Sequence, residues 1–200
     1  MSARLSSPSS ARNTEPILAI LRGHMPASGR VLEVACGAGE HALAFSRALP
    51  GLDWLPTDPD VSALASAADW RSEGPANLQP PLRLDATDET SWPEGPFHAV
   101  FCANMIHISP WAATEGLMRL AGQVLLAPGG LLVTYGPYLE ADHETAASNL
   151  AFDESLKNRN PEWGLRRLED VTATARDHGL HLTRRVEMPA NNLMLLFRRT

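Results

Sequence analysis

The 200-residue sequence has little cysteine, no long apolar run and no excess of basic residues, and each shortage excludes a class of protein. Its 2 cysteines, Cys36 and Cys102, are too few for a disulfide scaffold or for a zinc site built from paired cysteines. No apolar stretch approaches the ~18–20 residues that a membrane-spanning helix needs. Residues 1–16 lack the apolar core of a secretory signal, so we expect a reducing, cytoplasmic environment.

The charge balance argues against nucleic acid as a partner. Lys and Arg total 17 and Asp and Glu total 23, which gives a formal net charge of −6 at pH 7. Nucleic-acid-binding proteins usually neutralise phosphates with clustered basic side chains, whereas the basic residues here are scattered along the sequence. We therefore expect no nucleic acid as partner, and the absence of a long apolar run also argues against a membrane. The sequence leaves a monomer and a dimer equally open.

Short apolar runs alternate with helical patterns along most of the chain, after a flexible arm expected at residues 1–13. Strands are expected at 31–35, 52–58, 82–86, 97–104 and 131–137, and helices from Thr14, over 40–49, from Asp60, from Ser109–Pro110 to Leu126 and over 167–178. The segments 181–189 and 192–199 are expected to pair as a hairpin. This alternation predicts one α/β domain over 14–200, with helices on both faces of a seven-stranded, mostly parallel sheet that has one antiparallel strand. The long polar segment 138–166 is expected to be an irregular lid on the substrate side.

The sharpest local signal is the segment 33–42, EVACGAGEHA. Gly37 and Gly39 lie at a strand-to-helix turn, where glycine lets a ligand approach the backbone and the helix N-terminus offers free N–H groups. Together with Ala42 they also satisfy the G-x-G-x-x-[GA] pattern of dinucleotide-binding proteins. Asp58 ends the next strand about twenty residues later, where a carboxylate can hold both hydroxyls of a ribose.

Two further carboxylates help to distinguish the possible ligands. Glu33 lies inside the first strand, and we expect it to point at the pocket floor, where it would repel a pyrophosphate and stabilise an ammonium or sulfonium group. Asp85 ends the third expected strand, a position from which a carboxylate can accept a hydrogen bond from an adenine amino group. Both favour a nucleoside ligand with a cationic amino-acid part over a dinucleotide.

These motifs together resemble the class I S-adenosylmethionine-dependent methyltransferases. VLEVACGAG is similar to their glycine loop, TDPD to their ribose-binding strand end, RLDA to their adenine contact and LAPGGLL to the entry of their fifth strand. The resemblance is closer to the methyltransferase-like protein 26 type, also called domain of unknown function 938. It runs from Ser9 to the end of the chain through SSARNTEPIL, ANMIHISPW, PEWGLRRLEDV and MPANNLMLLFRR.

The resemblance implies the Rossmann-like class I methyltransferase fold. It also implies S-adenosyl-L-methionine as cofactor and S-adenosyl-L-homocysteine as product. The cofactor-binding residues expected on this basis and from the motifs above are Asn13, Glu33, Ala35, Gly37, Gly39, Asp58, Asp85, Ala86 and Asn104.

The expected reaction is methyl transfer to a small-molecule acceptor. Because a sulfonium already activates the methyl group, the protein mainly aligns the nucleophile and excludes water. A general base is needed only if the acceptor keeps its proton near pH 7. His107, just after the fourth expected strand, is the first candidate base, with an acidic limb of the rate expected near pH 6–7, and Tyr138 and His143 are the next candidates. A structural role for each of these residues remains open.

Two other functions stay open at this point. An NAD(P)-dependent oxidoreductase could use a similar glycine loop, and a non-catalytic protein could bind S-adenosylmethionine without a productive acceptor site. No metal is expected, because His41, His107 and His143 lack ligand spacing. The sequence does not select the acceptor or its reacting atom.

Overall fold

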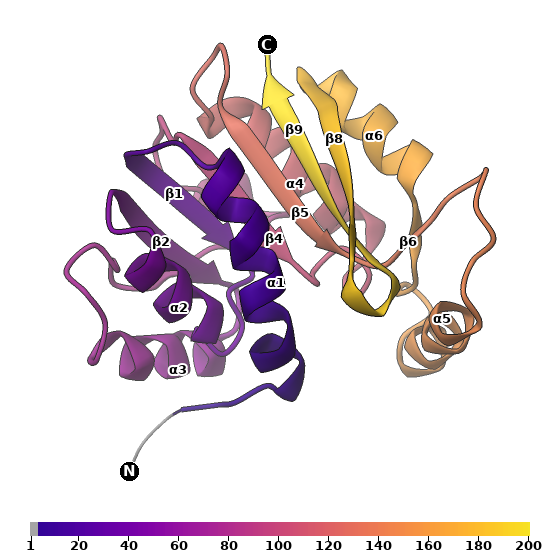
Figure 1. Ribbon diagram of the computed structural model, residues 1–200, viewed down its shortest axis with the longest axis horizontal. Helices are drawn as coiled ribbons and strands as arrows, with labels where there is room; N and C mark the ends of the chain where they lie inside the picture. Colours follow the sequence, from indigo (N-terminus) through magenta and orange to yellow (C-terminus); the bar gives the residue numbers. More distant parts are fainter. Residues whose placement is uncertain (1–3) are drawn as a thin grey trace.

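The computed structural model describes residues 4–200, which form a seven-stranded sheet in the order β3-β2-β1-β4-β5-β9-β8 and a separate two-stranded ribbon, β6-β7 (Figure 1). The strands are β1 Gly29–Val34, β2 Leu52–Asp58, β3 Leu82–Arg83, β4 Ala99–Ala103, β5 Leu131–Gly136, β6 Tyr138–Leu139, β7 Arg166–Arg167, β8 Leu180–Met188 and β9 Asn192–Arg199. The α-helices are α1 Pro8–His24, α2 Glu40–Ala48, α3 Val61–Arg71, α4 Trp111–Val124, α5 Ala147–Arg159 and α6 Leu168–Asp177. Two short 3-10 turns, η1 Glu89–Ser91 and η2 Pro189–Asn191, complete the secondary structure of the described part.

The pairing of the strands confirms the predicted architecture. Strands β1 to β5 pair in parallel, and β9 runs antiparallel to both β5 and β8. The hairpin predicted at the end of the chain is therefore formed, and it contributes the antiparallel strand of the seven-stranded sheet.

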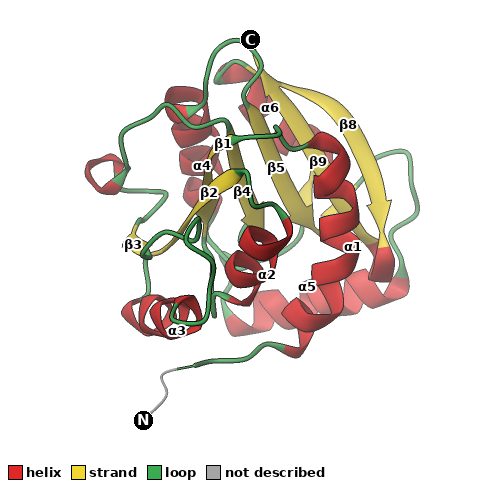
Figure 2. Ribbon diagram, turned by 60° about the vertical axis from the view of Figure 1, so that its left-hand side comes forward, coloured by secondary structure: helices red, strands yellow, loops and turns green. Residues whose placement is uncertain are grey.

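Each face of the sheet carries its own apolar core (Figures 1 and 2). Helices α1 and α2 cover one face, where Phe45 packs edge-on against Trp54 and Phe101 with ring centroids 5.6 and 5.5 Å apart. Helices α4 and α6 cover the other face, where Leu117 packs in the cluster that contains Val100. Val100 and Phe101 are neighbours in β4 and point to opposite faces, as successive strand residues do. Packing on both faces fixes the strands, and so fixes the points from which the loops leave the strand ends.

Helix α1 begins earlier than predicted, which corrects the expected arm. The helix starts at Pro8, with Ser7 as N-cap accepting a hydrogen bond from the Ser10 N–H, so residues 8–13 are helical. Ser7 followed by Pro8 is a favourable N-cap and first-turn pair, and it lies seven residues before Thr14, from which the helix was predicted. Residues 1–3 of the predicted arm lie outside the described residues.

The segment 138–166, predicted to be irregular, contains β6 and the helix α5. The buried residues of α5 are Asn149 and Leu156, so the helix lacks the apolar repeat by which a sequence usually reveals one. In Figure 1, α5 lies beside the turn that joins β8 to β9. The segment is thus a helical cover at one end of the sheet.

The third strand is also shorter than predicted. β3 ends at Arg83 and lies at the edge of the sheet, so Asp85 and Ala86 belong to the loop that follows it.

Candidate functional site

The chemistry-bearing residues gather at the edge of the sheet where the parallel strands end. The strand order reverses at β1, because β2 lies on one side of it and β4 on the other. Connections leaving β1 and β4 therefore diverge, and open α/β sheets bind ligands in the crevice that this creates. The turn between β8 and β9 lies at the same edge, because β9 runs antiparallel to β5.

The glycine loop between β1 and α2 has a left-handed backbone at alternate residues. Ala35, Gly37 and Gly39 have φ values of 58°, 54° and 89°. A Cβ atom at Gly37 would meet nothing within 4 Å, whereas one at Gly39 would lie 2.6 Å from the Cα of Ala67 in α3. Gly37 therefore borders open space, while Gly39 is required for the close packing of α2 against α3. Ligand approach at these two glycines stays a prediction, and the structure adds a packing role for Gly39.

Asp58 joins the end of β2 to the glycine loop. One carboxylate oxygen accepts from the Gly37 N–H at 2.9 Å and the other from the Asp60 N–H at 2.9 Å. Burial raises the pKa of Asp58, and the two backbone hydrogen bonds act in the opposite direction. Because a carboxylate has about four lone-pair positions, each oxygen keeps capacity to accept from a ligand hydroxyl.

Glu33 is placed differently from the predicted ionised group on the pocket floor. Its side chain is buried, and its Oε2 accepts a hydrogen bond of 2.6 Å from the Trp54 indole N–H. Burial raises the pKa of Glu33 to about 8; the Trp54 bond opposes this rise and the charge of Asp58 adds to it. Glu33 is therefore mainly protonated at pH 7, and the expected free carboxylate is corrected to a neutral, hydrogen-bonded acid.

The loop after β3 is held by its own hydrogen bonds and by α4. The Oδ1 atom of Asp85 accepts from the Thr87 N–H and hydroxyl at 2.8 and 2.7 Å, and its carbonyl accepts from the Trp92 indole at 3.0 Å. A Cβ at Gly116 in α4 would lie 2.0 Å from the Ala86 carbonyl oxygen. The absence of a side chain at Gly116 thus lets α4 support this loop.

The N-terminal segment lies against the same region. The Leu5 N–H donates to the Ser66 hydroxyl at 2.8 Å, and that hydroxyl donates to the Ala38 carbonyl of the glycine loop at 2.8 Å. The Ser7 N–H donates to Glu40, the first residue of α2, at 2.8 Å. These contacts set the start of α1 beside the glycine loop.

A cavity of about 560 Å³ contains three of the predicted site residues, Asn13, Asn104 and His107. The N–H of Asn104 donates to the Tyr135 carbonyl at 2.8 Å, which continues the pairing of β4 with β5, and its φ of 60° then turns the chain. A Cβ at Gly136 would lie 3.1 Å from the His107 ring, so this glycine makes room for the imidazole. The full lining is Ser9, Arg12, Asn13, Asn104, His107, Ile108, Pro137, Ser148, Asn149, Phe152, Arg159, Ala190, Asn191 and Asn192.

His107 is a buried and neutral imidazole. Burial, followed by the positive charges of Arg166 and Arg159, lowers its pKa to about 4. Its ring meets Phe152 edge-on with centroids 5.6 Å apart. The expected acidic limb at pH 6–7 is therefore wrong for the free protein, because the imidazole stays unprotonated down to about pH 4.

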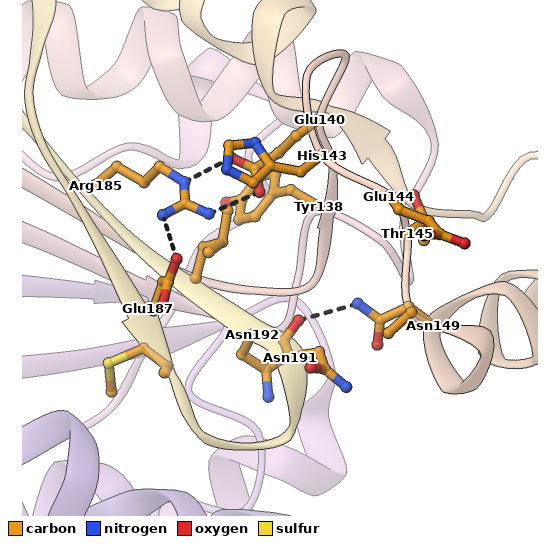
Figure 3. A pocket seen from close by; sticks show the side chains of 13 residues that line it. Tyr138, Glu140, His143, Glu144, Thr145, Asn149, Arg185, Glu187, Asn191 and Asn192 are labelled. Carbon is orange, nitrogen blue, oxygen red and sulfur yellow. Dashed lines mark hydrogen bonds and ion pairs between the residues drawn. The ribbon is translucent and has the colours of Figure 1, made fainter.

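Tyr138 and His143 lie around a second cavity, of about 290 Å³, and not with His107 (Figure 3). The Tyr138 hydroxyl is 2.8 Å from the Thr134 hydroxyl inside the core, and burial raises its pKa. His143 lies on the exposed loop before α5. The structure thus places Tyr138 and His143 around a different cavity from His107.

Sequence reasoning did not identify Arg159 or the turn between β8 and β9 as part of the lining of the His107 cavity. Ala190 and Asn191 in this turn have φ values of 57° and 56°, and the Asn191 carbonyl accepts from the Asn149 side chain at 3.0 Å. The segment PANN signals a turn, but nothing in its letters indicates that it meets α5 across a cavity.

The comparisons with known proteins agree with this geometry. The chain belongs to the family described as "Protein of unknown function (DUF938)", whose model matches residues 4–199. Among solved structures it is similar to an O-methyltransferase family protein from Burkholderia thailandensis, with a TM-score of 0.79 and 18% identity over 96% of this chain and 57% of that chain. It is also similar to CalO1, a methyltransferase in calicheamicin biosynthesis solved with S-adenosylhomocysteine (SAH), with a TM-score of 0.78 and 19% identity over 96% of this chain and 54% of that one.

Human N-acetylserotonin methyltransferase in complex with S-adenosylmethionine (SAM) matches at a TM-score of 0.78 and 14% identity, over 96% of this chain and 52% of that chain. At these identities the likeness establishes the Rossmann-like methyltransferase fold. The chain spans little more than half the length of the solved structures it matches.

Two further findings concern the described residues. Between residues 4 and 200, no group of three or more His, Cys, Asp and Glu side chains is placed to hold a metal ion. Within the same range, no helix has the length and apolar character needed to cross a bilayer.

The two loop glycines should respond differently to alanine. Gly39→Ala should lower the free energy of unfolding by about 2–3 kcal/mol, because its methyl group would overlap the backbone of Ala67. Gly37→Ala should cost only ~1 kcal/mol, from its left-handed backbone, because its methyl group enters open space. Urea unfolding of both variants measures the difference, and equal losses would contradict the assigned roles.

Glu33→Gln should change how stability depends on pH. The folded protein holds this proton up to about pH 8 while the unfolded chain releases it near 4.5, so wild-type stability falls as pH rises between these values. The variant has no proton to hold and should be more stable than wild type at pH 8 by about 1–3 kcal/mol, and nearly equal to it at pH 5. Urea titrations at both pH values measure this, with the exposed Glu94→Gln as charge-matched control. A difference that does not grow with pH would refute it.

Proposed function

We propose that this protein is a SAM-dependent methyltransferase that acts on a small-molecule acceptor. The observation that carries the proposal is that the start of α1 contacts both parts of the site: the Ser7 N–H donates to Glu40 at the end of the glycine loop, and Ser9 and Asn13 line the cavity that contains Asn104 and His107. The fold is that of CalO1 and human N-acetylserotonin methyltransferase, which were solved with SAH and SAM respectively. The sequence motifs also support the narrower likeness to the methyltransferase-like protein 26 type.

The residues present fit this cofactor. The open space at Gly37, where a Cβ would meet nothing, leaves room for a ligand against the loop backbone, with Ala35 and Gly39 shaping the turn. Asp58 keeps acceptor capacity on both oxygens for ribose hydroxyls. The adenine would be held by the other two expected residues, Asp85 and Ala86, from the loop after β3.

The amino-acid part of the cofactor would lie toward the cavity. Asn13 and Asn104 line that cavity and present amide groups that hydrogen-bond both carboxylate and ammonium groups. Glu33 is buried beside the loop, and a nearby ammonium group would favour its ionised form. When bound, SAM supplies a methyl group that its sulfonium already activates.

His107 is the residue we assign to the acceptor's proton. Its imidazole is neutral at pH 7 and reaches the cavity from its buried position, so it can accept a hydrogen bond from an acceptor hydroxyl. Phe152 on α5 packs against the ring and covers the cavity on that side, which helps to exclude water.

The alternatives predict different ligands. An NAD(P)-dependent oxidoreductase would bind a dinucleotide in place of SAM. A non-catalytic protein would bind SAM yet methylate nothing. A comparison of NAD⁺ and SAH binding distinguishes the oxidoreductase from the proposed methyltransferase. A measurement of methyl transfer distinguishes the non-catalytic protein from it.

Asp58→Asn should weaken SAH binding at least tenfold, because the amide nitrogen cannot accept a hydroxyl hydrogen bond. Asp60→Asn is the matched control: it removes the same charge two residues away, and asparagine caps α3 as well as aspartate does. Isothermal titration of both variants and wild type with SAH and with NAD⁺ measures this. Wild-type binding of NAD⁺ in preference to SAH would refute the proposed function.

His107→Gln should lower turnover by about 10²–10⁴-fold on any acceptor hydroxyl that wild type methylates, and keep SAH affinity within about threefold. In the free protein, the imidazole signal that this substitution removes from the NMR spectrum should titrate near pH 4. A stable variant with wild-type turnover, or a titration midpoint above pH 6, would argue against this role.

A further inference from the structure

The cavity that contains His107 carries positive charge and no acidic side chain. Arg12 and Arg159 are among its lining residues, and none of that lining is Asp or Glu. The chain as a whole has a net charge of −6, so this composition runs against the average of the protein. A cavity with one sign of charge concentrates ligands of the opposite sign.

The acidic residues of this region face the neighbouring cavity instead (Figure 3). Glu140, Glu144 and Glu187 line that second cavity, and Arg185 binds both Glu140, at 2.8 Å, and Glu187, at 3.2 Å. Asparagine side chains stand between the two spaces, because Asn149, Asn191 and Asn192 line both of them. Neutral amides therefore lie between an anion in the first cavity and the carboxylates of the second.

Arg159 is a cavity cation with few competing contacts. It ends α5, where its Nε donates a long hydrogen bond of 3.4 Å to the Ser155 carbonyl and its guanidinium lies 5.6 Å from the Trp163 ring centre. It forms no ion pair with any acidic residue in the described part of the chain. Its charge nevertheless reaches His107, because it contributes to lowering the pKa of that imidazole.

Apolar surface lies beside these charges. Ile108 is 42% exposed and Phe152 is 37% exposed, and both line the cavity together with Pro137. Apolar groups exposed at the wall of a pocket with a few polar groups are typical of a site for a small ligand with a ring or hydrocarbon body.

We propose that the methyl acceptor is a small aromatic carboxylate that carries a hydroxyl group, with its carboxylate bound by Arg159 and its ring against Phe152 and Ile108. This rests on the proposed function and specifies its substrate class. The hydroxyl oxygen gains the methyl group as the carbon–sulfur bond of the cofactor breaks, the sulfur keeps the electron pair of that bond, and the hydroxyl proton passes to His107. The guanidinium suits this role because it binds carboxylates with paired, charge-assisted hydrogen bonds.

The bound carboxylate also improves His107 as a base. Arg159 and Arg166 lower the pKa of the free imidazole, and an anion beside Arg159 offsets part of that effect. The pKa of His107 then rises toward the working pH, where a general base is most effective. A neutral acceptor would leave His107 a weak base.

The test compares 4-hydroxybenzoate with its neutral counterpart 4-hydroxybenzamide, each titrated calorimetrically into the protein saturated with SAH. Wild type should bind the acid at least tenfold more tightly than the amide. Arg159→Gln should weaken binding of the acid at least tenfold and leave the amide within about twofold. Arg176→Gln, at an exposed arginine of α6 outside the cavity, is the charge-matched control and should bind both compounds as wild type does.

Equal binding of acid and amide, an acid preference that survives in Arg159→Gln, or no binding of either compound at millimolar concentration would overturn the substrate class. The SAH titration that precedes each experiment separates the two proposals. Absence of SAH binding overturns both, whereas normal SAH binding without a preference for the acid overturns the substrate class alone.

Discussion

The hydrogen bond from the Gly37 N–H to the Asp58 carboxylate is the interaction on which the candidate site depends. It joins the loop after β1 to the end of the neighbouring strand β2. The two loops that follow these strands are therefore held together. The loop backbone is left-handed at Ala35 and Gly37, a conformation that an L-residue such as Ala35 adopts only when its surroundings impose it. The Asp58 carboxylate holds the left-handed residue Gly37 in place, and each of its oxygens keeps capacity to accept a further hydrogen bond.

Neutral asparagine side chains lie between a cavity lined by arginines and a cavity lined by carboxylates, both near the C-terminal ends of the parallel strands. Asn149 of α5 and Asn191 of the β8–β9 turn meet through a hydrogen bond, and the arginines that line one cavity lie apart from the carboxylates that line the other. Burial and the nearby arginines lower the pKa of His107 and so keep its imidazole neutral. The helix α5 therefore contributes both Phe152, which packs against the His107 ring, and Arg159, one of the charges that lower the pKa of His107.

The prediction succeeded where local patterns and tertiary packing agree. Buried parallel strands such as β4 and β5 are nearly continuous apolar runs, and their positions were predicted closely. It failed at α5, whose buried residues Asn149 and Leu156 form no apolar repeat. It also missed the packing of Gly39 against Ala67, because a glycine needed beside a ligand and a glycine needed beside a helix look identical in sequence.

The sequence by itself determined the seven-stranded sheet, the alternation of its strands with every helix except α5, and the carboxylates and glycines near the strand ends, because these follow from periodicity and turn chemistry within short segments. Only the tertiary structure decided that Glu33 is protonated, that His107 is neutral, and that Tyr138 belongs to another cavity. These properties depend on burial and on charges that arrive from distant elements. Arg159, from a helix that the sequence did not reveal, is one of the charges that act on His107. Such contacts exist only once the chain has folded.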